Sequence, residues 1–305
     1  MIYDVIIVGA GPAGITAGIY AKRAGLSTLV LEGSFIKGGQ IVNTQEIDNY
    51  PGLPGVGGIE LAEKMRLHLE QQGVEIKRGK VIKISQQDNL KMVHTKKTDY
   101  CGKTVVLASG TTRRMLDVPG EEEFLGSGVS YCATCDGAFF KGKTVAVIGG
   151  GDVAVEDADI LSGICKKVYV IHRRTELRAA KVLQDSLYKK DNVEFCWNQK
   201  VTQIGGELQV QWLKTENLIS GECKTLDVDG IFIAIGSVPN TEYLKDIIHL
   251  DSSGYIVAGE DGKTNIPGIF AAGDVRTKDL RQIITSAADG ANCIYSVESY
   301  LRGFC

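Results

Sequence analysis

Long apolar runs and blocks of like charge are both missing from this sequence of 305 residues. No stretch reaches the roughly 18 consecutive apolar residues that a membrane helix needs. The formal net charge is -3 and no five or six like charges stand together, which disfavours nucleic acid and membrane surfaces as partners. The apolar start, Met1 to Val8, runs into a glycine turn without a basic segment ahead of it, so it predicts a buried strand rather than a signal peptide. We therefore expect a soluble, cytoplasmic protein.

Cysteine is too sparse for a disulfide framework, with eight in the whole chain. Two of them stand three positions apart in Cys132-Ala133-Thr134-Cys135-Asp136. Zinc would need four ligands, and no second Cys-x-x-Cys or His pair is present, so a dithiol that cycles to a disulfide is favoured. The other six have no close partner in sequence, and we expect them to be reduced packing residues: Cys101, Cys165, Cys196, Cys223, Cys293 and Cys305.

Strands and helices alternate in a way that predicts an α/β fold. One strand–helix–strand unit is expected over Val5 to Leu31 and a second over Lys143 to Ile171. The stretch from Val193 to Val228 has short alternating runs that predict an antiparallel meander. Breaker-rich stretches at 110–120 and 236–250 predict two crossings between domains. We expect two Rossmann-like domains, with residues 113–243 inserted into a domain made of residues 1–112 and 244–305.

The first glycine motif is Gly9-Ala10-Gly11-Pro12-Ala13-Gly14, between a predicted strand and a predicted helix. Glycines there allow a tight turn and a close approach of the backbone to a pyrophosphate, which the helix N-terminus also favours. Glu32 ends the following strand, where a carboxylate can accept hydrogen bonds from ribose hydroxyls. Together these features predict a dinucleotide site.

The second glycine motif is Gly149-Gly150-Gly151-Asp152-Val153-Ala154, again between strand and helix. No acid follows at the ribose position. Instead His172, Arg173 and Arg174 close the next strand, and Arg178 follows. Guanidinium groups match a phosphate with paired hydrogen bonds, so this site is predicted to prefer NADP over NAD.

In order and spacing, these motifs resemble the low-molecular-weight thioredoxin reductases, and the likeness covers nearly the whole chain. Besides both glycine motifs, the dithiol and the arginines, the matching stretches are Gly38-Gly39-Gln40, Asp48-Asn49-Tyr50-Pro51-Gly52, Ala272-Gly273-Asp274-Val275 and Arg281-Gln282-Ile283. In the larger glutathione-reductase type the redox pair follows the first nucleotide motif, whereas this chain has no cysteine before Cys101.

The resemblance implies an enzyme that passes electrons from NADPH to FAD, then to the Cys132–Cys135 disulfide and to oxidised thioredoxin. It implies that Cys135 faces the flavin, that Cys132 attacks the partner and that Asp136 is the acid and base. It also implies a homodimer and a rotation of the NADPH domain about the two crossings. FAD would contact the first glycine motif and a set implied by the family: Glu32, Gly33, Gly38, Gly39, Gln40, Asn49, Gly273, Asp274, Arg281, Gln282 and Ile283.

The chain departs from the family at Val153, where a Ser or Thr usually donates a hydrogen bond near the pyrophosphate, so weaker NADPH binding is expected. Three alternatives stay open at this point. The partner could be another redoxin or a peroxiredoxin-linked domain. An oxygen-using flavin dithiol oxidase would have no need of Arg173 and Arg174. An NADP-binding sensor with a structural disulfide would have no need of two nucleotide sites.

Overall fold

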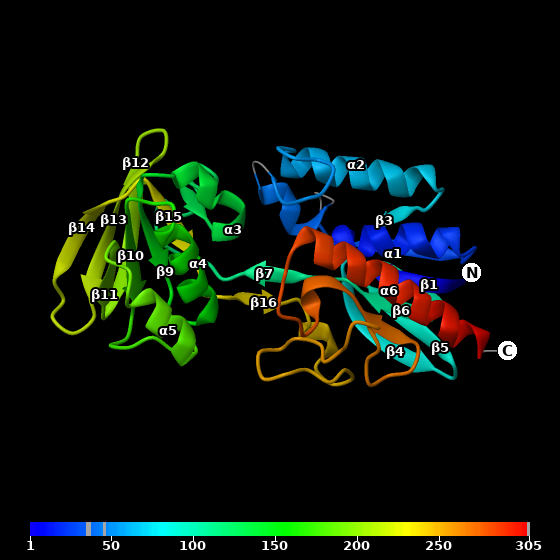
Figure 1. Ribbon diagram of the computed structural model, residues 1–305. Helices are drawn as coiled ribbons and strands as arrows, with labels where there is room; N and C mark the ends of the chain where they lie inside the picture. Colours follow the sequence, from blue (N-terminus) through cyan, green and yellow to red (C-terminus); the bar gives the residue numbers. More distant parts are fainter. Residues whose placement is uncertain (35–37, 45–46, 304–305) are drawn as a thin grey trace. The chain divides into compact units, whose positions relative to one another are not determined.

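The computed structural model describes residues 1–34, 38–44 and 47–303. The chain divides into unit 1, formed by residues 1–112 and 238–305, and unit 2, formed by residues 113–237. Figure 1 shows both units. The second border lies before Val238, whereas the sequence placed it before Leu244. Residues 238–243 belong to unit 1 because Tyr243 packs against a core cluster of that unit and Asn240 is hydrogen-bonded to Ser109 and Gly110.

Unit 1 is built on a sheet with the strand order β3-β2-β1-β6-β5-β4, and β17 pairs with β6. The strands β3, β2, β1, β6 and β17 run parallel, and β5 and β4 continue the sheet antiparallel. The return of β17 to β6 makes unit 2 an insertion, as predicted. The bounds are β1 Ile2–Val8, β2 Thr28–Glu32, β3 Ile76–Arg78, β4 Val81–Gln87, β5 Leu90–Thr95, β6 Asp99–Leu107 and β17 Ile269–Ala271.

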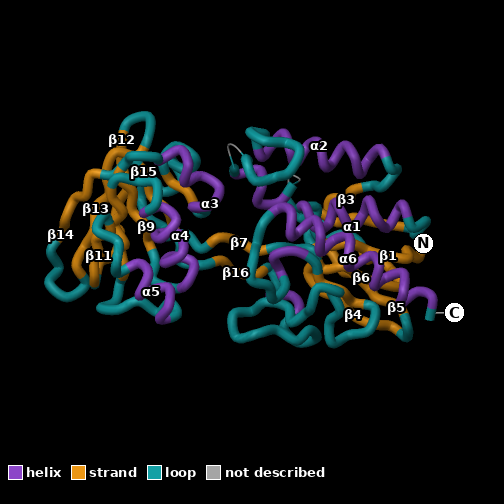
Figure 2. The backbone as a smooth tube through the Cα atoms, in the orientation of Figure 1, coloured by secondary structure: helices purple, strands orange, loops and turns teal. Residues whose placement is uncertain are grey.

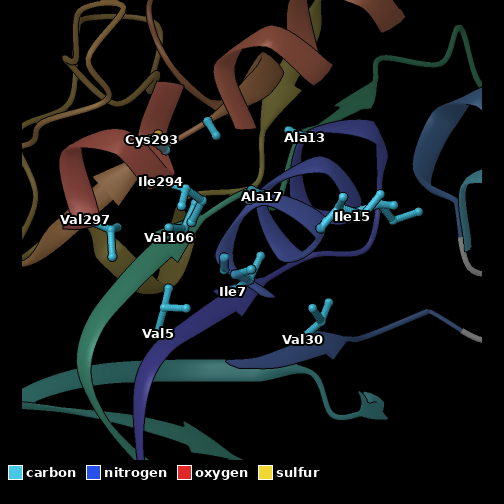
Figure 3. Packing of buried hydrophobic residues seen from close by; sticks show 14 of the residues in the cluster. Val5, Ile7, Ala13, Ile15, Ala17, Val30, Val106, Cys293, Ile294 and Val297 are labelled. Carbon is cyan, nitrogen blue, oxygen red and sulfur yellow. The ribbon is translucent and has the colours of Figure 1, made fainter. Parts of the chain in front are cut away.

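Helices α1 (Pro12–Arg23) and α6 (Ile283–Arg302) pack together in unit 1. Their backbones come close because Gly290 has no side chain: a Cβ there would lie 2.2 Å from the carbonyl oxygen of Ala13. Figure 3 shows the apolar side chains of β1, α1 and α6 meeting in one core. The other helical elements of this unit are α2 (Gly58–Gln71), η1 (Gly39–Asn43), η3 (Glu242–Leu244) and η4 (Gly273–Val275).

Unit 2 has a parallel sheet with the order β11-β10-β9-β15-β8 and a separate antiparallel sheet β12-β13-β14. The prediction of a meander over the whole of Val193 to Val228 is wrong at its start, because β11 pairs in parallel with β10. The strand bounds are β8 Val129–Ser130, β9 Thr144–Ile148, β10 Lys167–His172, β11 Val193–Trp197, β12 Gln199–Gly206, β13 Val210–Asn217, β14 Cys223–Asp227 and β15 Gly230–Ile233.

The helices of unit 2 are short, and the longest of them, α4, begins directly after the three glycines of the second glycine motif. The bounds are α3 Ala133–Asp136, η2 Gly137–Phe140, α4 Asp152–Ser162 and α5 Lys181–Leu187. Helix α3 packs on α4, which places the dithiol segment beside the helix of the nucleotide motif.

The chain crosses between the units in two strands, β7 (Thr111–Arg113) and β16 (Ser237–Pro239), which pair with each other in a two-stranded sheet (Figure 2). On the unit 1 side, Asn240 holds this region together: its N–H donates to the carbonyl of Gly110 at 3.0 Å, and its side-chain amide donates to that of Ser109 at 2.8 Å. Within the described residues, no helix combines the length and apolar character needed to span a membrane.

Candidate redox and nucleotide-binding sites

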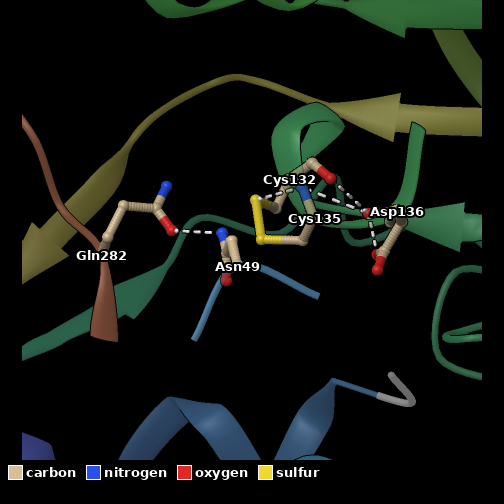
Figure 4. The surroundings of a disulfide bond; sticks show 6 residues. Asn49, Cys132, Cys135, Asp136 and Gln282 are labelled. Carbon is tan, nitrogen blue, oxygen red and sulfur yellow. Dashed lines mark hydrogen bonds between the residues drawn. A yellow bond between two sulfur atoms is a disulfide. The ribbon is translucent and has the colours of Figure 1, made fainter. Parts of the chain in front are cut away.

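Cys132 and Cys135 form a disulfide in unit 2, with their Cα atoms 5.3 Å apart (Figure 4). Strand β8 ends two residues before Cys132, and α3 begins directly after it. Cys132 is the residue that caps α3, since its sulfur accepts the backbone N–H of Cys135 at 3.2 Å. The single helical turn therefore brings together the two cysteines that the sequence singled out.

Asp136 ends the same helical turn and is held by Ser130 of β8. The Ser130 hydroxyl donates to Asp136 Oδ2 at 2.5 Å and accepts the backbone N–H of Cys132 at 3.0 Å. Burial raises the pKa of Asp136, while the Ser130 hydrogen bond and the positive charge of Arg113 oppose that rise. A carboxyl group with a raised pKa beside a dithiol suits proton transfer during thiol–disulfide exchange.

Asp157 is a second carboxylate beside the dithiol, and the sequence interpretation missed it. It lies on α4, is 8% exposed and accepts the backbone N–H of Ala133. Burial is the main cause that raises the pKa of Asp157 to about 7, and the charge of Glu156 adds to it. The available signal was helical spacing, since Asp157 stands three residues after Ala154 and four before Leu161, both on the apolar face of the predicted helix.

The remaining cysteines that the structure describes are free: Cys101, Cys165, Cys196, Cys223 and Cys293. Cys165 and Cys293 are buried, but Cys223 is exposed on β14, so the expectation of a packing role is wrong there. Cys305 lies outside the described residues. Among the residues with described positions, no group of three His, Cys, Asp or Glu side chains is arranged to hold a metal ion.

The first glycine motif forms the turn from β1 to α1. Gly9 has a φ of 110°, and a Cβ there would lie 2.2 Å from the carbonyl oxygen of Ala108. Gly11 precedes α1, Pro12 is the first helical residue, and Ala13 and Gly14 follow in the first turn. A Cβ on Gly39 would lie 3.2 Å from the Cα of Gly11, so two backbone segments approach each other without side chains between them.

Glu32 joins this turn to the end of β2. Its carboxylate accepts the backbone N–H of Ala10 at 2.9 Å and that of Ser34 at 2.7 Å. Each carboxylate oxygen has two lone pairs, so acceptor capacity is left for a ribose hydroxyl. Gly33 follows Glu32 and lies beside Lys80.

Three further segments of unit 1 carry residues implied for the first nucleotide. Gly38 and Gly39 lead into η1, and Gln40 donates to the carbonyl oxygen of Thr111 at 2.7 Å. Asn49 donates to the side-chain oxygen of Gln282 at 3.1 Å (Figure 4), and Ile283 then begins α6. Arg281 lies with its guanidinium carbon 4.2 Å from the centre of the Tyr255 ring.

Asp289 is a buried carboxylate that positions the loop after β17, and it too was missed from sequence. It accepts the backbone N–H of Gly273 at 2.9 Å and pairs with Arg276 and Lys278 at 2.6 and 2.9 Å. These two cations hold the pKa of Asp289 below its usual value although burial opposes them. Next to this loop, Ser286 donates to Asp274 at 2.9 Å, and burial raises the pKa of Asp274.

The second glycine motif forms the turn from β9 to α4 in unit 2. A Cβ on Gly149 would lie 2.4 Å from the carbonyl oxygen of Ala234, and one on Gly150 would meet the His172 ring at 2.4 Å. His172 is therefore a buried support for the turn, and burial with the nearby arginines lowers its pKa. Asp152 accepts the backbone N–H of Ala180 at 2.7 Å, which ties the start of α4 to the start of α5.

The basic residues of this motif face solvent: Arg173, Arg174 and Arg178 are all exposed. The Arg178 backbone N–H donates to the carbonyl of Gly150 at 2.6 Å, which fixes the arginine segment beside the glycine turn. At the start of α4, Val153 is 58% exposed and Ala154 is buried. An exposed cluster of guanidinium groups next to a helix N-terminus is suited to a phosphate group.

Both turns fit the phosphates of a dinucleotide. At the first, the close approach of Gly11 and Gly39 gives a surface of bare backbone. At the second, a Cβ on Gly151 would meet none of the described atoms within 4 Å, so the backbone at the start of α4 is open. Unit 1 offers an acid at the ribose position, whereas unit 2 offers arginines.

The comparisons with known proteins agree with this geometry. Residues 3–290 match the family described as pyridine nucleotide-disulphide oxidoreductase. A thioredoxin reductase of Listeria monocytogenes is 44% identical over 302 residues, which cover 99% of this chain and 94% of that protein. One from Bacillus subtilis is 42% identical, with coverages of 99% and 95%. The crystal structure of thioredoxin reductase from Streptococcus pyogenes is 46% identical with a TM-score of 0.93, covering 99% of both chains. The chain therefore belongs to the pyridine nucleotide-disulphide oxidoreductases, whose cofactors are a flavin and a pyridine nucleotide.

Proposed function

We propose that this protein is a thioredoxin-disulfide reductase that takes electrons from NADPH and delivers them through FAD to the Cys132–Cys135 pair. The observation that carries the proposal is the Cys132–Cys135 disulfide beside the half-buried Asp136, in the same unit as the arginine-bearing glycine turn. The relatives named thioredoxin reductase support it, because the likeness extends over 99% of the chain.

FAD is assigned to unit 1 and NADPH to unit 2. The assignment rests on the residues at the end of the strand that follows each glycine turn. An acid such as Glu32 suits a free ribose hydroxyl, whereas Arg173 and Arg174 suit a 2′-phosphate. In unit 1 the bare backbone at Gly11 and Gly39 would hold the pyrophosphate, and Asp274 and Arg281 would contact the rest of FAD. When bound, the flavin would accept a hydride from the nicotinamide and supply two electrons to the disulfide.

The protein's own residues would carry out the exchange with thioredoxin. In the dithiol state, the Cys132 thiol gives its proton to the Asp136 carboxylate, and the resulting thiolate attacks one sulfur of the thioredoxin disulfide. A mixed S–S bond forms as the thioredoxin S–S bond breaks, and the released thiolate takes the proton from Asp136. Cys135 then loses its proton and attacks the Cys132 sulfur, and the second thioredoxin thiolate receives that proton. Cys132–Cys135 is again a disulfide, and thioredoxin leaves as a dithiol.

The test is oxidation of NADPH by the FAD-loaded protein in the presence of oxidised thioredoxin, with NADH as the alternative donor. We expect rapid oxidation of NADPH, a much slower reaction with NADH and no reaction in Cys132→Ser. The double variant Arg173→Gln/Arg174→Gln should raise the KM for NADPH by roughly tenfold or more and leave that for NADH unchanged, since each charged hydrogen bond contributes about 1.5–3 kcal/mol. The exposed Lys224→Gln on β14 is the matched charge control.

Other outcomes would point to the alternatives. NADPH oxidation with a glutaredoxin-type acceptor but not with thioredoxin would reassign the partner. Dithiol oxidation that consumes oxygen and needs no NADPH would reassign the protein as a flavin dithiol oxidase. A protein that retains no flavin would contradict the whole electron path.

The resemblance also supports a homodimer and a cytoplasmic location, and both belong to this proposal. Sedimentation of the FAD-loaded protein measures the first: a mass of twice 32.9 kDa is expected, and a stable monomer would contradict it.

A further inference from the structure

Arg113 contacts the residue that directly precedes the redox pair, although no part of the dithiol motif includes it. It is the last residue of β7 and is half-buried. Its guanidinium carbon lies 4.9 Å from the centre of the Tyr131 ring, a distance at which a cation is attracted to the face of an aromatic ring. Tyr131 directly precedes Cys132, so the charge of Arg113 is held next to the reactive segment.

Buried Glu121 fixes the ring of Tyr131. The Tyr131 hydroxyl donates to Glu121 Oε1 at 2.6 Å. Glu121 is only 2% exposed and also accepts the backbone N–H groups of Leu116 and Asp117, at 2.9 and 2.8 Å. Three hydrogen bonds leave this carboxylate little freedom, so Tyr131 is a rigid support for the guanidinium. Burial and the Glu121 bond raise the pKa of Tyr131, which keeps the ring neutral.

The charges that face Asp136 come from several elements. Arg113 is the nearby cation from β7, and its attraction acts against the effect of burial on the Asp136 carboxyl. Ser130 of β8 donates the hydrogen bond already described. Helix α4, which packs on α3, carries Asp157, which accepts the backbone N–H of Ala133, and Glu156, whose charge acts on Asp157. The other neighbour, η2, has the sequence Gly-Ala-Phe-Phe and no ionisable side chain.

We propose that Arg113 is a positioning residue for thiol–disulfide exchange, because its guanidinium, held on the Tyr131 ring, sets the protonation state of Asp136 beside the Cys132–Cys135 pair. The role of Asp136 in this statement rests on the proposed function. Arg113 acts through Asp136, which must be ionised to take a proton from Cys132.

The sign of the effect follows from the charge. A nearby cation favours the ionised carboxyl, so loss of Arg113 raises the pKa of Asp136. At neutral pH, more of the protein then holds Asp136 protonated and unable to act as a base. In the pH profile of the rate of thioredoxin reduction, the acidic limb should therefore move to higher pH.

The experiment compares Arg113→Met, Arg113→Lys and the control Arg114→Met in the FAD-loaded protein. Arg114 is the neighbouring arginine and is exposed. We expect Arg113→Met to move the acidic limb upwards by about one pH unit, the lower end of the range for an opposite charge nearby. Arg113→Lys, which keeps the charge, should restore most of the wild-type profile, and Arg114→Met should leave it unchanged. A loss of rate at every pH with an unmoved limb would overturn the proposal.

A second readout needs no turnover. The carboxyl band of Asp136 can be followed by infrared titration, with Asp136→Asn identifying the band. Arg113→Met should move its midpoint upwards by the same amount, and an unmoved midpoint in a variant that keeps its flavin spectrum would overturn the proposal. If wild-type protein fails to reduce thioredoxin, the proposed function fails, but this titration still decides the role of Arg113.

Discussion

Ser130 and Asp136 share a hydrogen bond of 2.5 Å, and the same Ser130 hydroxyl accepts the backbone N–H of Cys132. One serine therefore connects the carboxylate to the backbone of the cysteine that the family resemblance makes the attacking residue. Because Ser130 lies at the end of the buried strand β8, the parallel sheet of unit 2 positions both groups.

Removal of the Ser130 hydroxyl should make Asp136 less effective as a base. In Ser130→Ala the ionised carboxylate of Asp136 loses a charged hydrogen bond, so its pKa rises. We expect thioredoxin reduction at neutral pH to slow by about tenfold, with recovery at higher pH, since such bonds contribute roughly 1.5–3 kcal/mol. Stopped-flow measurement with pre-reduced protein checks this, with Ser127→Ala as the control. A uniform slowing at all pH values would show a structural defect instead.

Asp157 should make stability depend on pH. The pKa of its carboxyl is about 7 in the folded protein, against 3.8 for the exposed group. Between these values the folded chain holds a proton that the unfolded chain releases. The free energy of unfolding should therefore fall as pH rises from about 4 to about 7, by as much as about 4 kcal/mol.

Urea denaturation across this pH range measures the effect. Asp157→Asn keeps an acceptor for the N–H of Ala133 but does not titrate, so its unfolding free energy should exceed that of the wild type near neutral pH and vary less with pH. The half-buried Asp159, on the same helix, provides the control variant Asp159→Asn. Parallel pH profiles for wild type and Asp157→Asn would contradict a raised pKa at this carboxyl.

Asp289 should support both stability and flavin retention. Asp289→Asn can still accept the N–H of Gly273, but it leaves the charges of Arg276 and Lys278 without their buried partner. Breaking a buried ion pair costs about 3–5 kcal/mol, so the urea midpoint should fall and FAD should dissociate more readily. Asp279→Asn, on the exposed side of the same segment, should change neither. A normal midpoint would mean that the pair adds no net stability.

Val153→Ser should strengthen NADPH binding. The residue lies in the first turn of α4 and is 58% exposed, so a hydroxyl can be added there without burial. One added hydrogen bond contributes about 1 kcal/mol, which corresponds to about fivefold tighter binding. Calorimetric titration of NADPH measures this, and Val182→Ser on α5 is the control because that side chain is also exposed. Equal affinities would show that the hydroxyl finds no partner on the coenzyme.

Local signals were sufficient for much of the fold. The sequence predicts Thr144 to Ile148 as a strand, and β9 has these bounds, because a short β-branched run ends at a glycine turn. The sequence predicts helices that begin at Ala13 and at Val153, and α1 and α4 each begin one residue earlier. The motif glycines were recognisable because a tight turn between a strand and a helix requires glycine at fixed positions in the sequence.

Pairing between strands was harder to predict. Residues 193–197 alternate like a strand of a meander, yet β11 pairs in parallel with β10, with Val193 opposite Val168. The choice of partner strand is made in the tertiary structure and is not visible in the alternation. Similarly, the sequence assigned residues 238–243 to the inserted domain, whereas they lie in unit 1, where Tyr243 packs against side chains that are far away in sequence.

The sequence alone determined the α/β class, the two glycine turns, the dithiol and the arginines, since each is a local pattern with a local physical cause. Only the tertiary structure showed that Asp157, Asp289 and Glu121 are buried carboxylates and that Arg113 lies on Tyr131. Charge alone makes these residues look like surface positions in a sequence. Their pKa values and partners depend on desolvation and on groups that the fold brings together, and no spacing along the chain encodes those distances.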